Sequence, residues 1–196
     1  MKKLLLILLC VPMIGFGQLT YVPDDNFEAY LEANGMGNSI ANDDYVFTYL
    51  IDTIIYLDIN NLGIGDLIGI EAFSSLTTLN CQGNQLITLD LSNNLALDSL
   101  QCGGNQLTNL DVSGATSLTW LSCGSNQLTS LDLSNNIALD TLYCINNPLT
   151  NLDVTNNIAL INLQLQGNQL TSLDVSQNTA LTYLVFSWNQ ITSLDV

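Results

Sequence analysis

The apolar positions between Leu76 and Val196 recur with a 21-residue period. In the third period, which reads LTWLSCGSNQLTSLDLSNNIA, apolar residues occupy the first, fourth, sixth, eleventh, fourteenth and sixteenth positions. A fixed period of this length is typical of a solenoid, in which each repeat forms one coil packed on the next. The periods begin at Leu76, Leu97, Leu118, Leu139, Leu160 and Leu181.

Each period contains one short segment, around its fourth to sixth positions, in which apolar and polar residues alternate. Alternation of this kind predicts a β-strand, and equivalent strands of successive coils would pair as one parallel sheet. The rest of the period has room for an extended or 3₁₀ return but not for a full helix. The pattern therefore predicts a repeat solenoid with a single continuous sheet along it.

The solenoid is expected to span residues 54–196. Its first turn, 54–75, is a variant with one extra residue, and the regular turns start at residue 76. The last turn stops at Val196, two-thirds of the way through a repeat and without a cap. We therefore expect either a truncated gene product or a neighbouring region missing from this sequence.

Residues 18–53 precede the repeats and are expected to form a cap and a linker. The run from Pro23 to Gly35 has early acidic residues, helically spaced apolar residues and a terminal glycine, which predict a short amphipathic helix. This helix would cover the open end of the solenoid. Residues 36–53 are predicted to be an irregular link.

Residues 1–17 have the pattern of a secretory signal peptide. Two lysines precede a short apolar run, and glycines stand at the −3 and −1 positions of a cleavage site after Gly17. A lipoprotein signal at Cys10 is the alternative, but Leu9 occupies a place where such signals need a small residue. The run is too short to span a membrane, so the mature chain, without a membrane span, should be secreted or held at the cell surface.

Removal of the signal peptide would remove every basic residue, because the only lysines are Lys2 and Lys3 and the chain has no Arg or His. The 18 acidic residues would then give a formal charge of −18. Such a chain should not bind nucleic acid, and it lacks the usual general bases of enzymes. Its thiols are expected to be buried and its serines lack a base, so we expect no enzymatic activity. We also expect that the protein has no cofactor and is a monomer. The charge would attract metal cations or basic partners, or simply keep the protein soluble.

One column of asparagines recurs at the ninth position of each period. A stacked amide can satisfy backbone groups of its own and a neighbouring coil, so a structural ladder is expected. Its members are Asn84, Asn105, Asn126, Asn147, Asn168 and Asn189.

A column of aspartates recurs at the fifteenth position. Each should accept a hydrogen bond from the backbone N–H two residues on, which would offset the repulsion between neighbours. Calcium bound along the column is the alternative. The members are Asp90, Asp111, Asp132, Asp153, Asp174 and Asp195.

A cysteine column, Cys81, Cys102, Cys123 and Cys144, occupies an inward position that holds Leu165 and Phe186 in the last two turns. These residues are expected to be buried free thiols. The parallel strand spacing is too long for a disulfide, and the C-x2-C spacing of zinc sites is absent.

The pattern L-x-x-L-x-C-x-x-N-Q-L-x-x-L-D-x-S-x-N resembles the leucine-rich repeats of bacterial surface proteins, and is similar in particular to cysteine-ladder repeats of the internalin J type. The resemblance covers residues 76–196 closely, and turn 54–75 is similar to a 22-residue internalin-type repeat. It implies a curved, right-handed solenoid with its β-sheet on the concave face. It also implies adhesion or protein recognition outside the cell.

Outward strand residues would line that concave face. Most are small and uncharged, but several are apolar or aromatic although the core is already full, which predicts a recognition surface for an extracellular protein or a glycan. A structural spacer within a longer surface protein is the alternative. The predicted binding residues are Trp120, Tyr143, Ile145, Gln164, Tyr183, Val185 and Trp188.

The link between cap and repeats offers oxygen ligands at Asp43 and Asp44, of the kind that calcium prefers. The spacing does not follow a calcium-binding loop, so a polar turn is the favoured interpretation and no metal is predicted.

Overall fold

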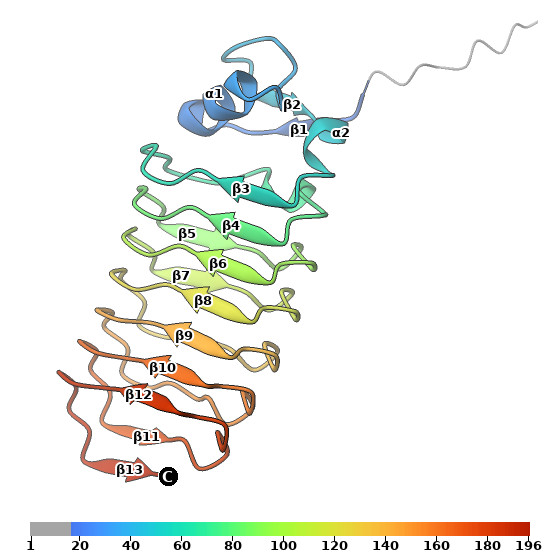
Figure 1. Ribbon diagram of the computed structural model, residues 1–196. Helices are drawn as coiled ribbons and strands as arrows, with labels where there is room; N and C mark the ends of the chain where they lie inside the picture. Colours follow the sequence, from blue (N-terminus) through green and yellow to red (C-terminus); the bar gives the residue numbers. More distant parts are fainter. Residues whose placement is uncertain (1–16) are drawn as a thin grey trace, which may run out of the picture.

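The computed structural model describes residues 17–196, which form a stack of coils beneath an N-terminal cap (Figure 1). Each coil contributes one strand to a seven-stranded parallel sheet, called here the main sheet. Its strands, in spatial order, are β3 (Tyr56–Asp58), β4 (Thr78–Asn80), β6 (Ser99–Gln101), β8 (Trp120–Ser122), β9 (Thr141–Tyr143), β10 (Asn162–Gln164) and β12 (Tyr183–Val185).

The register of the main sheet follows the sequence period. Leu121 of β8 pairs with Leu142 of β9, which is the same position of the next period. Leu57 of β3 pairs with Leu79 of β4 in the same way, although the variant turn between them is one residue longer. The extra residue is thus absorbed outside the strands. The predicted parallel sheet is confirmed.

The opposite side of the coils is extended and carries two-stranded pairings, which were not predicted individually. Two separate parallel pairs form there. They are β5 (Thr88–Asp90) with β7 (Asn109–Asp111), and β11 (Ser172–Asp174) with β13 (Ser193–Asp195). A 3₁₀ turn, η1 (Ile70–Ala72), lies in the variant coil.

The apolar positions of the period meet inside the coils and form one continuous core. In the third coil, Leu118, Leu121 and Leu128 are fully buried, and Leu131 is 8% exposed. In the last coil Leu184 is only partly buried, because no later coil lies on it within the described residues. Each coil therefore depends on its neighbours for burial.

The predicted cap helix is present as α1 (Asp25–Ala33). Asp24 caps it by accepting hydrogen bonds from the backbone N–H groups of Asn26 and Phe27, each at 3.0 Å. Phe27 is buried and stacks on Phe73 of the variant coil, with ring centroids 6.1 Å apart. The helix thereby covers the end of the solenoid (Figure 1).

The prediction of an irregular link over residues 36–53 is wrong for its second half. That half contains β2 (Tyr45–Phe47) and the short helix α2 (Thr48–Ile51). β2 pairs antiparallel with β1 (Leu19–Tyr21), and its central Val46 is buried. A three-residue strand is too short to be recognised without the distant partner that stabilises it.

The signal peptide predicted over residues 1–17 lies, apart from its last residue, outside the described part of the chain and stays a prediction. Within the described residues, neither helix has the length and apolar composition needed to cross a membrane.

Candidate recognition surface

The outward face of the main sheet is built from the first and third residues of each strand, since the middle residue points into the core. The strand register aligns these residues in two rows across the later coils. One row runs Trp120, Thr141, Asn162, Tyr183, and the other runs Ser122, Tyr143, Gln164, Val185.

Three of the predicted binding residues belong to one connected cluster on this face. The Trp120 and Tyr143 rings meet edge to face, with centroids 5.8 Å apart and an interplanar angle of 84°. The Asn162 amide Nδ2 donates to the Tyr143 hydroxyl at 3.1 Å, and Gln164 Nε2 donates to Asn162 Oδ1 at 3.3 Å. All four side chains are half-buried, so they are ordered by one another and still open to solvent. We call Trp120, Tyr143, Asn162 and Gln164 the aromatic–amide cluster.

Sequence reasoning missed Asn162 as a member of this cluster. Its outward strand position was recognisable from the alternation, but its contact with Tyr143 depends on the side-chain conformations of two coils. The hydrogen bond fixes the Tyr143 ring, so Asn162 contributes to the shape of the surface.

The remaining predicted residues surround the cluster. Tyr183 and Val185 lie on β12, the strand next to Gln164, and Tyr183 is 53% exposed. Ile145 is half-buried beyond the end of β9. A Cβ atom at Gly124 would lie only 3.0 Å from the Ile145 carbonyl oxygen, so a glycine keeps the neighbouring coil close at this point.

Trp188 is the most exposed of the predicted residues, at 81%, and its backbone has φ of +56°. The same place in the other coils also has positive φ, but holds small or turn-forming residues: Asn61, Gly83, Gly104, Ser125, Asn146 and Gly167. A left-handed conformation costs an L-residue other than glycine about 1–2 kcal/mol. The exposed Trp188 side chain recovers little of this by burial, which makes it a candidate for a functional role.

The asparagine ladder is engaged inside the solenoid. Asn126 Nδ2 donates to the carbonyl oxygens of Cys102 at 3.1 Å and Cys123 at 3.0 Å, and Asn126 Oδ1 accepts from the Leu107 N–H at 3.0 Å. The amide therefore joins its own coil to the preceding one. Equivalent bonds connect Asn84, Asn105, Asn147, Asn168 and Asn189 to the preceding coils.

A second asparagine ladder, which sequence reasoning missed, lies at the nineteenth position of the period. Its members donate to two carbonyl oxygens of the preceding coil, while their buried Oδ1 atoms have no hydrogen-bond partner among the described residues. Ala115 interrupts the column in the second coil. The recurrence of asparagine was the signal that could have revealed it. The members are Asn94, Asn136, Asn157 and Asn178.

The four cysteines of the inward column are free and fully buried. Burial raises the pKa of the Cys81 thiol to about 12, and it also raises the pKa of the Cys102 thiol. Thiols in this state are poor nucleophiles and poor metal ligands, so the column acts as part of the apolar core.

The aspartate column fixes the corners of the coils. Oδ1 of Asp90, Asp111, Asp132, Asp153 and Asp174 accepts from the backbone N–H two residues later, at 2.9 Å in every case. Hydrogen bonds from the Thr155 hydroxyl and N–H lower the pKa of Asp153. Asp90, Asp132 and Asp174 have lowered pKa values for the same kind of reason.

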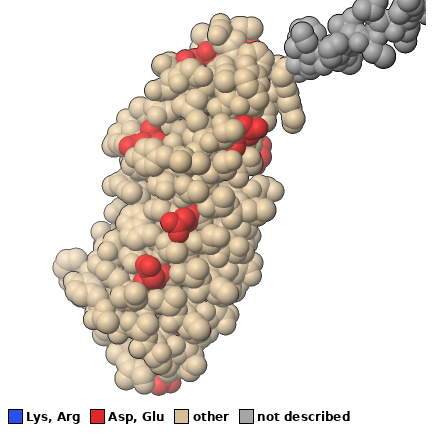
Figure 2. All heavy atoms as spheres, turned by 45° about the vertical axis from the view of Figure 1, so that its right-hand side comes forward, with Lys and Arg blue, Asp and Glu red and all other residues tan. Residues whose placement is uncertain are grey.

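The two link residues considered as calcium ligands have different surroundings. Asp43 accepts hydrogen bonds from the Asn38 side chain and from the Tyr45 N–H. Asp44 instead lies beside two carboxylates of α1. On the face drawn in Figure 2, acidic side chains form small separate groups with no basic side chain among them.

Comparison with known proteins identifies the type of repeat. No protein-family model matches the sequence. A stretch of 74 residues, 38% of this chain and 8% of the relative, is 42% identical to internalin J of Listeria monocytogenes serotype 4b (strain F2365). The solved functional domain of InlJ from Listeria monocytogenes, which includes a cysteine ladder, matches 91% of this chain with 37% identity and a TM-score of 0.66. The repeats are internalin J-like leucine-rich repeats.

This internalin J-like array spans less than half of either relative, since it covers 45% of the InlJ domain. The internalin InlF of Listeria monocytogenes shares the fold over 90% of this chain and 63% of its own, with 22% identity and a TM-score of 0.60. YopM of Yersinia enterocolitica is 27% identical over 73% of this chain and 31% of its own, also with a TM-score of 0.60. The predicted leucine-rich-repeat solenoid is thereby confirmed.

Proposed function

We propose that this chain is an exported, non-catalytic recognition or adhesion module that binds an extracellular protein through the outward face of the main sheet. The observation that carries the proposal is the aromatic–amide cluster. The core of the coils is filled mainly by leucines, with a cysteine in four of the coils, so Trp120 and Tyr143 are not needed to complete it. A pair of ordered, half-exposed aromatic rings beside amide groups provides the contacts typical of binding hot spots.

The charge of the chain indicates which kind of partner surface it would bind. Beyond Lys3 the chain has no basic residue, so the partner surface is expected to be neutral or basic where it meets the sheet. The relatives support a module of this class, because InlJ and InlF are Listeria internalins built on the same fold. A glycan, stacked on the rings and hydrogen-bonded to the amides, is the alternative ligand.

The test is binding of the purified segment 18–196 to arrays of extracellular proteins and glycans. The variant Trp120→Ala/Tyr143→Ala/Tyr183→Ala should lose at least tenfold in affinity while keeping the circular dichroism spectrum of the parent. A matched control is Leu95→Ala/Ile137→Ala/Ile158→Ala, which removes three side chains that are 61–64% exposed elsewhere on the coils. This control should bind like the parent.

A second variant separates binding from folding at Trp188. Trp188→Gly removes the side chain but suits the positive φ, so it should bind more weakly and yet be at least as stable as the parent. If the parent binds nothing, or if the triple variant binds equally well, the proposal fails and the structural spacer becomes the better account.

A further inference from the structure

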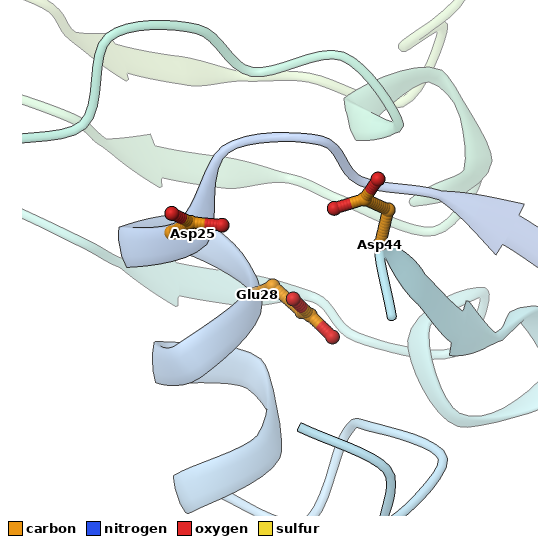
Figure 3. Close-up of side chains that lie close together, drawn as sticks. All are labelled: Asp25, Glu28 and Asp44. Carbon is orange, nitrogen blue, oxygen red and sulfur yellow. The ribbon is translucent and has the colours of Figure 1, made fainter. Parts of the chain in front are cut away.

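Three carboxylates converge in the cap, away from the main sheet. Asp25 and Glu28 lie one turn apart on α1, and Asp44 is the residue before β2. One carboxylate oxygen from each residue lies within 4.8 Å of those from the other two. Figure 3 shows the two helix residues and Asp44 bordering the same space between α1 and the chain that enters β2.

Glu28 is the unusual member of this group. It is 1% exposed, although glutamate is among the residues that are least often buried. Its Oε1 accepts a hydrogen bond from the Asp43 N–H at 3.1 Å, but its buried Oε2 has no hydrogen-bond partner within the described residues. A buried carboxylate oxygen without a partner is costly, so a positive ligand at this place would remove a real penalty.

No side chain among the described residues can supply the missing positive charge. The only basic residues of the sequence are Lys2 and Lys3, which precede the described residues. Burial and the neighbouring Asp43 carboxylate raise the pKa of Glu28, with burial as the larger cause. Hydrogen bonds from the backbone N–H groups of Asp43 and Asp44 oppose this shift, and a proton or a cation from solution would offset the remaining cost of burying the Glu28 carboxylate.

We propose that Asp25, Glu28 and Asp44 form a calcium site in the cap. The donors are all carboxylate oxygens, which suit Ca²⁺ or Mg²⁺ and not Zn²⁺. Calcium binds oxygens at about 2.3–2.6 Å, so ligands on opposite sides of the ion lie about 4.6–5.2 Å apart. Magnesium, at about 2.0–2.1 Å, would need them no more than about 4.2 Å apart, and it keeps more of its own water. The oxygen separations within the cluster are at most 4.8 Å, which calcium can span between ligands on opposite sides of the ion.

The ion would join two parts of the cap that are distant in sequence. Asp25 and Glu28 belong to α1, while the Asp44 carbonyl oxygen accepts from the Val22 N–H at 2.8 Å, next to β1. Calcium would therefore fasten the helix to the β1–β2 pair and hold the cap over the variant coil. Extracellular calcium sites commonly have Kd values of about 0.1–1 mM, so calcium would strengthen the cap where the proposed module is exported.

The experiment uses segment 18–196 after treatment with EDTA, titrated with CaCl2 and followed by calorimetry and thermal unfolding. We expect one equivalent of calcium to bind. At a calcium concentration about 100 times the Kd, Tm should rise by about 5–10 °C. MgCl2 at the same concentration should raise Tm by less.

Three variants locate the site. Glu28→Gln and Asp44→Asn should abolish the calcium-dependent shift in Tm, and Asp25→Asn, which changes an exposed side chain and so keeps the fold, should weaken calcium binding at least tenfold. The control Asp140→Asn removes one negative charge from a side chain that makes no hydrogen bond within the described residues, and it should respond like the parent. Absence of saturable binding by the parent up to about 10 mM calcium, ten times the weakest expected Kd, would overturn the proposal. The proposal would also be overturned if Asp25→Asn and Asp44→Asn bound calcium as tightly as the parent does.

Discussion

Replacement of Asn126 by alanine isolates the contribution of the asparagine ladder to stability. Asn126 is 8% exposed and lies in the third of the regular coils. Within the part of the chain that the structure describes, the change removes the only acceptor of the buried Leu107 N–H. It also removes one of the two amide donors that reach each of the Cys102 and Cys123 carbonyl oxygens. The carbonyls keep a partner, in Asn105 and Asn147, but the Leu107 N–H does not.

The expected loss of stability follows from the difference between the two carbonyl groups, which keep a donor, and the Leu107 N–H, which loses its acceptor. A buried N–H without an acceptor costs about 1–3 kcal/mol, and each lost but replaceable hydrogen bond costs about 1 kcal/mol or less. We therefore expect Asn126→Ala to lower the free energy of unfolding by about 2–4 kcal/mol. Asn157→Ala, in the second ladder, is the matched control. Asn157 donates to the Leu133 and Asn136 carbonyls, which also accept main-chain hydrogen bonds, so its loss leaves no N–H unpaired.

Guanidinium unfolding of segment 18–196, monitored by circular dichroism and by tryptophan fluorescence, gives both free energies. Coincident transitions and equal m-values are required, because repeat proteins do not always unfold in one step. We expect Asn126→Ala to lower the free energy of unfolding by about 1–3 kcal/mol more than Asn157→Ala does. An equal or larger loss for Asn157→Ala would refute the assignment of the stability to the Leu107 N–H.

Three further predictions concern the aspartate and cysteine columns. Because the folded-state pKa of Asp153 is below its ordinary value of 3.8, its stabilising effect is present above that pH and is lost as the pH falls through the folded value. The destabilisation caused by Asp153→Asn should thus shrink in acid, as measured by urea unfolding from pH 7 to pH 3, and a penalty independent of pH would contradict this. The four buried thiols should not react with Ellman's reagent in the native segment 18–196 but should all react in guanidinium, and rapid labelling of the native protein would contradict their burial. Burial raises the pKa of Cys81 to about 12, against an ordinary 9.0. The protonated thiol should therefore contribute fully to stability below pH 9, and this contribution should be lost between pH 9 and 12. Thermal unfolding across that range would measure the loss.

The sequence alone determined the repeating part of the protein. A contact such as Leu121 with Leu142 recurs at the same separation in every regular coil, so the period itself specifies which residues pair. The six apolar positions per coil, the inward cysteines and the presence of a short helix between Pro23 and Gly35 could also be predicted, because each depends on a local or periodic pattern. The second asparagine ladder was present in the same pattern and was overlooked.

The tertiary structure decided the contacts that occur once. β2 exists because it meets β1, from which the whole of α1 separates it in the sequence, and Glu28 is buried because α1 packs under the link that carries Asp43 and Asp44. The hydrogen bond from Asn162 to Tyr143 likewise depends on which rotamers two coils adopt together. A periodic contact is made by residues that recur at the same positions of every coil, so it can be recognised from the sequence. A unique contact depends on the three-dimensional path of the chain. For that reason the solenoid could be predicted from the sequence, whereas the carboxylate cluster of the cap and the aromatic–amide cluster could not.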